Sequence, residues 1–184
     1  MGKWRYGMQP SLFIANYIIE YSNKKNYLIN NLKLQKLLYF ANVIKIVDTK
    51  NPLFEEQMEK WKYGPVVPSV YHEYKRFGAF QITNKDIVRD FISFGDTSNG
   101  SLGNLKILKY RSEEISKPDA ELLKKVVDKL SNIDVFDLVG ITHNQELWKK
   151  DEKLISDGVQ GIKYTNDEIV QYFDKHPEDL EWIK

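Results

Sequence analysis

The sequence contains no cysteine, and this absence excludes several kinds of chemistry at once. Disulfide bonds, cysteine-ligated zinc, iron–sulfur clusters and thiol nucleophiles all require that residue. Glycine-rich phosphate loops of the G-x-G-x-x-G or G-x-x-x-x-G-K-[ST] type are also missing. The histidines, His72, His143 and His176, are too scattered for a recognisable metal-ligand spacing. We therefore predict no metal site, no cofactor and no catalytic residue, and we expect that the chain is not an enzyme.

The three histidines are expected to have structural or surface roles. His72 and His176 are predicted on the solvated surface. His143 follows Thr142 in a stretch typical of a helix N-terminus, where the helix dipole disfavours a charged imidazolium. Capping or core hydrogen bonding is the favoured role for His143, and an acid–base group is the alternative.

Long apolar runs and an excess of one charge are absent too. No run of about 18 apolar residues is present, so no membrane span is predicted. The apolar stretch over 12–19 is short, contains Asn16 and lacks a following cleavage site, which argues against a signal peptide. Lys plus Arg number 27 against 26 acids, and basic doublets are interleaved with acids along the chain. We expect a cytoplasmic protein with no membrane partner and no nucleic-acid partner.

What the sequence does contain is enough apolar and aromatic material for a well-formed core. Hydrophobic residues make up 42% and aromatic residues 13% of the 184 residues. A chain of this length typically forms one domain. We predict a single domain over 1–184, with a motif-bearing core at about 12–155 and a C-terminal helix and tail at 165–184.

Hydrophobic periodicity predicts a mainly α fold, a compact helical domain with a small β element of two or three strands. The helix over 31–47 is apolar around most of its circumference, so it is expected to be the central, buried helix. Ser11, Ser116, Thr142 and Thr165 are predicted N-caps. The expected helices cover 11–22, 31–47, 68–77, 83–91, 116–130, 135–139, 142–155 and 165–173.

The β element is predicted from two segments. Residues 58–63 alternate, with Trp61 and Tyr63 on one face and lysines on the other, and Gly64–Pro65 is expected to end the strand. Residues 106–110 form the second predicted strand. This second strand is the expected partner of the first.

Two further segments are distinguished by composition. The stretch GDTSNGSLGN over 95–104 is typical of a flexible loop. The tail over 176–184 is polar apart from Leu180, Trp182 and Ile183. Docking against the core and fraying are both compatible with this tail.

Three segments resemble the motifs of the Panacea domain. The first, K-L-Q-K-L-L-Y-F-A over 33–41, lies on the predicted central helix. The second is P-L-F at 52–54 followed by W-x-Y-G-P-V-V-P-x-V-Y over 61–71. The third, L-T-H-x-x-x-x-W over 141–148, has Ile141 in place of leucine. The matching residues, as structural or toxin-binding positions, are Leu34, Gln35, Lys36, Leu37, Leu38, Tyr39, Phe40, Trp61, Tyr63, Gly64, Pro65, Val66, Val67, Pro68, Tyr71, Thr142, His143 and Trp148.

The resemblance implies an antitoxin of a bacterial or phage toxin–antitoxin pair, with a cognate toxin encoded by an adjacent gene. Members of this family generally neutralise their toxins by direct protein contact, and one delivers its toxin to a protease as an adaptor. Some members carry an added DNA-binding domain, for which we expect no room before Leu12. The family has no established catalytic residues. The alternatives to a masking antitoxin are therefore a proteolytic adaptor and a DNA-binding transcriptional regulator.

The second motif is also rich in aromatic side chains, which are common at protein interfaces. We predict Tyr63, Val66, Tyr71 and Tyr74 as candidate contacts with the partner. The motif glycine, its prolines and Trp61 are expected to form a rigid turn that holds the fold. In the alternative interpretation the whole motif is structural, and variable loops such as 95–104 select the partner.

Overall fold

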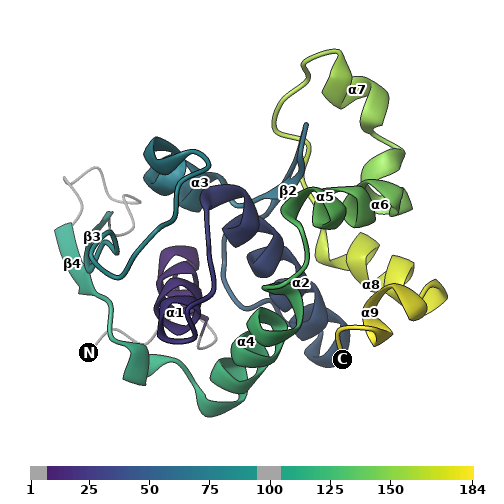
Figure 1. Cartoon of the computed structure of the whole chain (residues 1–184). Coiled ribbons are helices and arrows are strands. Elements are labelled where there is room, and N and C mark those ends of the chain that lie inside the picture. Colours follow the sequence, from purple (N-terminus) through teal and green to yellow (C-terminus); the bar gives the residue numbers. More distant parts are fainter. Residues whose placement is uncertain (1–7, 95–104) are drawn as a thin grey trace.

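The computed structural model describes residues 8–94 and 105–184, and these residues are mostly helical (Figure 1). The predicted mainly α fold with a minor β element is confirmed. The predicted loop over 95–104 lies outside the described residues. None of the helices in the described ranges is long and apolar enough to cross a membrane. The elements in chain order are α1 (Ser11–Lys24), α2 (Asn31–Thr49), β1 (Glu59–Trp61), β2 (Gly64–Val66), α3 (Pro68–Tyr74) with a 3-10 turn (Lys75–Phe77), β3 (Asp90–Phe94), β4 (Leu105–Lys109), a 3-10 turn (Ser112–Glu114), α4 (Lys117–Leu130), α5 (Val135–Asn144), α6 (Glu146–Lys149), α7 (Glu152–Ser156), α8 (Asn166–Lys175) and α9 (Glu178–Glu181).

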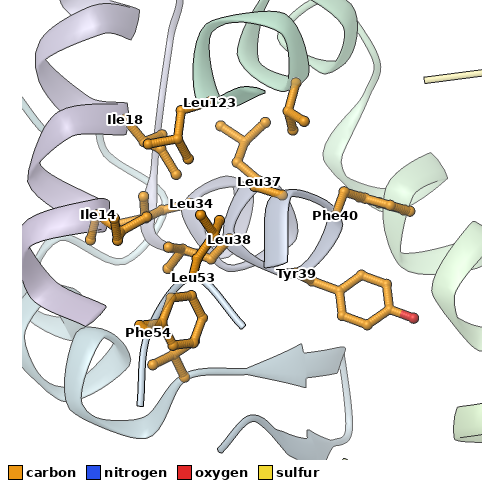
Figure 2. Close-up of a cluster of buried hydrophobic side chains, with 14 of the residues drawn as sticks. Ile14, Ile18, Leu34, Leu37, Leu38, Tyr39, Phe40, Leu53, Phe54 and Leu123 are labelled. Carbon is orange, nitrogen blue, oxygen red and sulfur yellow. The ribbon is translucent and has the colours of Figure 1, made fainter. Parts of the chain in front are cut away.

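The long helix α2 runs through the middle of the molecule and is buried on nearly every side (Figure 1). The side chain of Asn30 begins it by accepting the backbone N–H of Lys33 at 2.9 Å, and Lys50 ends it in the left-handed conformation. Helices α1, α3, α4, α5 and α8 pack against it. Burial of one large apolar side chain contributes about 1.5–3 kcal/mol, so this helix organises the core as predicted. Figure 2 shows part of that core, in which side chains of α2 meet those of α1, α4 and the segment after α2: Leu34, Leu37, Leu38, Tyr39, Phe40, Ile14, Ile18, Leu123, Leu53 and Phe54.

The first pair of strands is a tight hairpin, and its pairing differs from the predicted one. Strand β1 pairs antiparallel with β2, and Trp61 lies opposite Gly64 across a turn formed by Lys62 and Tyr63. The prediction that 106–110 would pair with this strand is wrong. Pairing with the next segment of the chain closes a far shorter loop, and the smaller entropy loss favours it.

The other edge of β1 is covered by a segment from the C-terminal third of the chain. The Lys60 N–H donates to the Ile162 carbonyl at 2.7 Å, and the Tyr164 N–H donates to the Met58 carbonyl at 2.9 Å. An antiparallel bridge joins Glu59 to the same segment. Both edges of β1 are therefore occupied, which fixes the hairpin in place.

The second pair of strands corrects the prediction of a helix over 83–91. Strands β3 and β4 pair antiparallel, with Phe91 opposite Leu108. The contact expected at the start of that helix is present, because the Thr83 hydroxyl donates to the Asp86 carboxylate at 2.7 Å, but it closes only a turn. The Phe91 ring packs 5.4 Å from the Phe13 ring of α1. Packing against α1 thus outweighs the helical spacing of the apolar residues.

The predicted helix starts are partly confirmed. Ser116 and Thr165 cap α4 and α8, since each side chain accepts the backbone N–H three residues later. Ser11 was expected to cap α1, but Pro10 precedes the helix. The Ser11 hydroxyl instead donates to the Glu56 carboxylate at 2.8 Å.

Helices α5 and α6 correct the prediction around Thr142. Helix α5 continues to Asn144, and α6 begins only after Gln145. The Thr142 hydroxyl does not cap a helix, because it donates to the Val139 carbonyl at 2.9 Å. His143 therefore lies in the last turn of a helix rather than the first, and the helix dipole there has the opposite sign to the one expected.

The C-terminal tail is docked against the core. Leu180 and Ile183 are buried. The Trp182 ring meets the Phe40 ring of α2 edge-on, with centroids 5.8 Å apart. Of the two behaviours compatible with the sequence, the structure shows docking.

Candidate functional site

The first two motifs are joined by a chain of buried amide groups. The side-chain oxygen of Gln35, in α2, accepts the backbone N–H of Val67 at 2.8 Å. Its amide nitrogen donates to the side chain of Asn31 at 3.1 Å, and the Asn31 amide donates to the Tyr71 carbonyl at 3.1 Å. Leaving such a buried group unpaired costs about 1–3 kcal/mol. These bonds therefore fix where the hairpin ends and α3 begins.

Lys36 lies under the hairpin turn and is fully buried. Its side-chain nitrogen donates to the Tyr63 carbonyl. Burial lowers the pKa of Lys36 to about 7. Gly64 passes so close that a Cβ atom there would lie 2.6 Å from the Thr142 hydroxyl oxygen and closer still to the Lys36 nitrogen. Because Gly64 also has φ +91°, only glycine fits this position without strain.

Tyr39 joins the first motif to the third. Its hydroxyl donates to the side-chain oxygen of Gln145, which is buried between α5 and α6. The Tyr39 ring also meets the Tyr164 ring, with centroids 5.7 Å apart. Burial raises the pKa of Tyr39 well above its usual range, so the hydroxyl keeps the proton that this bond requires.

Trp148 joins the third motif to the second. Its indole N–H donates to the Trp61 carbonyl at 3.0 Å. The His143 ring stacks on Trp148, with centroids 3.7 Å apart and planes inclined by 9°. Burial is the main cause that lowers the pKa of His143, and the nearby Lys36 is the second. The ring is therefore neutral at physiological pH. The structure thus places His143 as a stacked ring that supports the tryptophan.

A buried ion cluster beside the hairpin was not found by sequence reasoning. The Lys60 ammonium lies 2.7 Å from the Asp151 carboxylate and 3.1 Å from the Glu168 carboxylate. It also lies over the Tyr164 ring, 4.9 Å from the centroid. Lys150 contacts Glu168 from the solvent side at 2.9 Å. These residues come from distant segments, and no spacing in the sequence could have identified them together.

The polar groups of the three motifs are mostly bonded to one another. Among the residues that the structure describes, no group of three or more His, Asp or Glu side chains is arranged to hold a metal ion. The arrangement holds the turn of the hairpin rigidly in place.

A family profile described as the Antitoxin SocA-like, Panacea domain matches residues 34–149, which span the three motif segments from Leu34 onward. The chain belongs to this family. Antitoxin SocA of Caulobacter vibrioides (strain NA1000 / CB15N) is 40% identical over 80 residues, which are 44% of this chain and 43% of that protein. The chain thus matches less than half the length of this curated relative. No solved structure matches the chain.

Most of the Panacea motif residues lie inside the domain. Of the four predicted partner contacts, Val66 and Tyr74 are buried, and the Tyr74 hydroxyl donates to the Asn16 side chain at 2.6 Å. Tyr63 is 52% exposed at the hairpin turn, and Tyr71 is half-buried with its ring 4.9 Å from that of Trp61. The motif residues that the structure places in the interior are Leu34, Gln35, Lys36, Leu37, Leu38, Tyr39, Phe40, Gly64, Pro65, Val66, Val67, Thr142 and Trp148.

The accessible part of the motif borders a shallow cavity. A cavity of about 370 Å³ lies between the hairpin and the segment around α7, and Trp61, His72, Ile155 and Val159 line it. Tyr63 and this cavity together make up the accessible surface of the second motif and its surroundings. We refer to it below as the hairpin face.

Proposed function

We propose that this Panacea domain is a cytoplasmic antitoxin that neutralises a cognate toxin by binding it directly. Membership of the Antitoxin SocA-like family, over residues 34–149, is the observation that carries the proposal. The similarity to Antitoxin SocA of Caulobacter vibrioides supports it. A binding role also agrees with a site whose polar groups bond to one another beneath an aromatic turn.

We propose the hairpin face as one contact with the toxin. Tyr63 has a large ring and a hydroxyl group. Tyrosine is enriched among the residues that contribute most to the binding free energy of protein interfaces. The Tyr63 carbonyl accepts a hydrogen bond from Lys36. The neighbouring Gly64 has a positive φ and close contacts with Lys36 and Thr142, which restrict the backbone at the turn. A partner therefore meets Tyr63 in a preorganised position, and little ordering entropy is lost on binding.

Co-expression with each flanking open reading frame tests the proposal. The expected result is that one flanking product stops growth alone, that the chain restores growth, and that the two proteins co-purify. A Tyr63→Ser variant should weaken co-purification, whereas Ile107→Ser, a change at an exposed apolar residue of β4 outside the hairpin face, should not.

Other outcomes of the same experiment distinguish the alternative functions. Rescue without a stable complex, together with protease-dependent loss of the toxin, would favour an adaptor. Salt-sensitive binding of the isolated chain to its own promoter would favour a transcriptional regulator. If neither flanking product is toxic, the antitoxin proposal is wrong.

A further inference from the structure

Three connecting segments of the domain meet at a surface distinct from the hairpin face. They are the loop between α1 and α2, the segment after α3, and the loop between α4 and α5. The Ile82 N–H donates to the Ile29 carbonyl at 2.8 Å, which joins the first two segments. The ammonium of Lys33 donates to the Ile133 carbonyl, which joins α2 to the third. We call residues 26–30, 79–82 and 131–136 the three-loop face.

Large apolar side chains are exposed on this face. Leu28 is 75% exposed, Phe80 is 80% exposed and Phe136 is 64% exposed. Leu28 lines a cavity of about 270 Å³. Ala79, which precedes Phe80, and Val135, which precedes Phe136, line the same cavity. From the size of the Leu28, Phe80 and Phe136 side chains, their exposed apolar areas sum to roughly 400 Å².

The surroundings of the three-loop face are predominantly basic. The exposed cations on the bordering residues are Lys24, Lys25, Lys75, Arg76 and Lys129. The exposed acids on the same stretches are Asp128, Asp134 and Asp137. Two of these acids are already engaged, because Asp128 accepts two tyrosine hydroxyls and Asp134 caps α5. Both acids keep their charge, so the five cations and three acids give these stretches a net charge of about +2.

We propose that the three-loop face binds an apolar segment of the toxin that is flanked by acidic residues. This inference rests on the proposed function, since it names a second surface for the same partner. A standard protein–protein interface buries about 800 Å² on each side, more than the three exposed side chains of the three-loop face supply. The two faces are linked through the start of α2 and α3, because the Asn31 amide donates to the Tyr71 carbonyl at 3.1 Å and the preceding Asn30 lines the three-loop cavity.

The charge pattern decides between the possible occupants. A second copy of the chain would bring the same cations face to face, which is unfavourable. A membrane surface would attract the cations, but membrane-bound proteins typically present one amphipathic helix rather than a cavity between loops. A cavity with an apolar rim fits an inserted side chain of a protein partner.

The test measures binding of the full chain to the purified flanking gene product that co-expression identifies as the toxin. We expect the double variant Phe80→Ser/Phe136→Ser to raise the Kd at least tenfold while the melting temperature stays near that of the unaltered chain. The matched control is Ile107→Ser, because Ile107 on β4 is 66% exposed and lies outside this face. That control should bind normally.

A charge variant gives a second, independent readout. Lys24→Glu/Lys25→Glu should slow association several-fold at low salt, and the difference should vanish at high salt because rim charges act mainly on the association rate. The doublet Lys124→Glu/Lys125→Glu, exposed on α4, is the matched control.

The outcomes separate failure of this inference from failure of the proposed function. If the unaltered chain binds the toxin and both test variants bind equally well, the three-loop face is not a toxin contact. Loss of self-association, or of binding to anionic phosphatidylserine vesicles, in the phenylalanine variant with toxin binding unchanged would also overturn the inference. If the unaltered chain binds no flanking product, the antitoxin proposal fails and this inference fails with it.

Discussion

At the scale of single residues, Lys36 is the most unusual position in the domain. A lysine with no exposed surface and a backbone carbonyl as its hydrogen-bond partner is rare, because burial disfavours the charged form. Its pKa falls from 10.5 to about 7 in the folded protein. The unfolded chain therefore keeps a proton on Lys36 over a range of pH in which the folded chain has released it.

This difference predicts a pH dependence of stability. Between pH 7 and about 10 the unfolded state binds more protons, so the free energy of unfolding rises with pH by up to about 1.4 kcal/mol per pH unit. In Lys36→Met the rise should be absent. Urea unfolding at pH 7.5, 8.2 and 9 measures it, because the reference pKa values of histidine and tyrosine lie below and above this window. Lys124→Met, an exposed control, should keep the rise, and equal slopes for Lys36→Met and the unaltered chain would contradict the prediction.

Gly64 gives a second prediction at this scale. Gly64→Ala should cost about 2–5 kcal/mol, because the positive φ and the close approach of Lys36 and Thr142 both oppose a side chain. Gly158 is the matched control, since it has φ +87° and no atom within 4 Å of a Cβ built there. Gly158→Ala should show only the backbone strain, about 1–2 kcal/mol. Equal losses in urea unfolding would show that the contact with Lys36 is unimportant.

At the scale of elements, the hairpin is held from the far side by the ion cluster that α8 completes. Glu168 lies 3.1 Å from Lys60 and 2.9 Å from Lys150, and the Lys60 side chain is almost fully buried. Glu168→Gln keeps the size but removes the charge, and should cost about 1–3 kcal/mol because Lys60 retains Asp151. Lys150→Ala, which removes the exposed partner, should cost about 0–1 kcal/mol. Denaturant midpoints compare the two, and a larger loss for Lys150→Ala would contradict this account.

At the scale of the whole molecule, the tail completes the packing around α2. Removal of residues 177–184 exposes the sites of Leu180 and Ile183 and should cost about 3–6 kcal/mol, since each side chain contributes about 1.5–3 kcal/mol. Lys184→Ala removes only the ion pair with Asp48 on the surface, and should cost about 0–1 kcal/mol. Thermal unfolding of the two variants measures the difference. Similar melting temperatures would mean that the docked tail adds little to stability.

The sequence by itself determined the helices whose signals are local. The 3.6-residue periodicity and the apolar circumference of 31–47 identified α2, which runs from Asn31 to Thr49. Ser116 and Thr165 were recognised as caps because a cap acts within four residues. The family was recognisable for the same reason, since its motifs are short, contiguous and ordered along the chain.

Only the tertiary structure decided which distant segments meet. Strand partners, the continuous α5 and the burial of Val66 and Tyr74 depend on what packs against each segment. The cluster of Lys60, Asp151 and Glu168 and the three-loop face each combine segments that are far apart along the chain. Such contacts form when burial of apolar surface outweighs the entropy lost in closing long loops, and that balance belongs to the whole fold rather than to any local pattern.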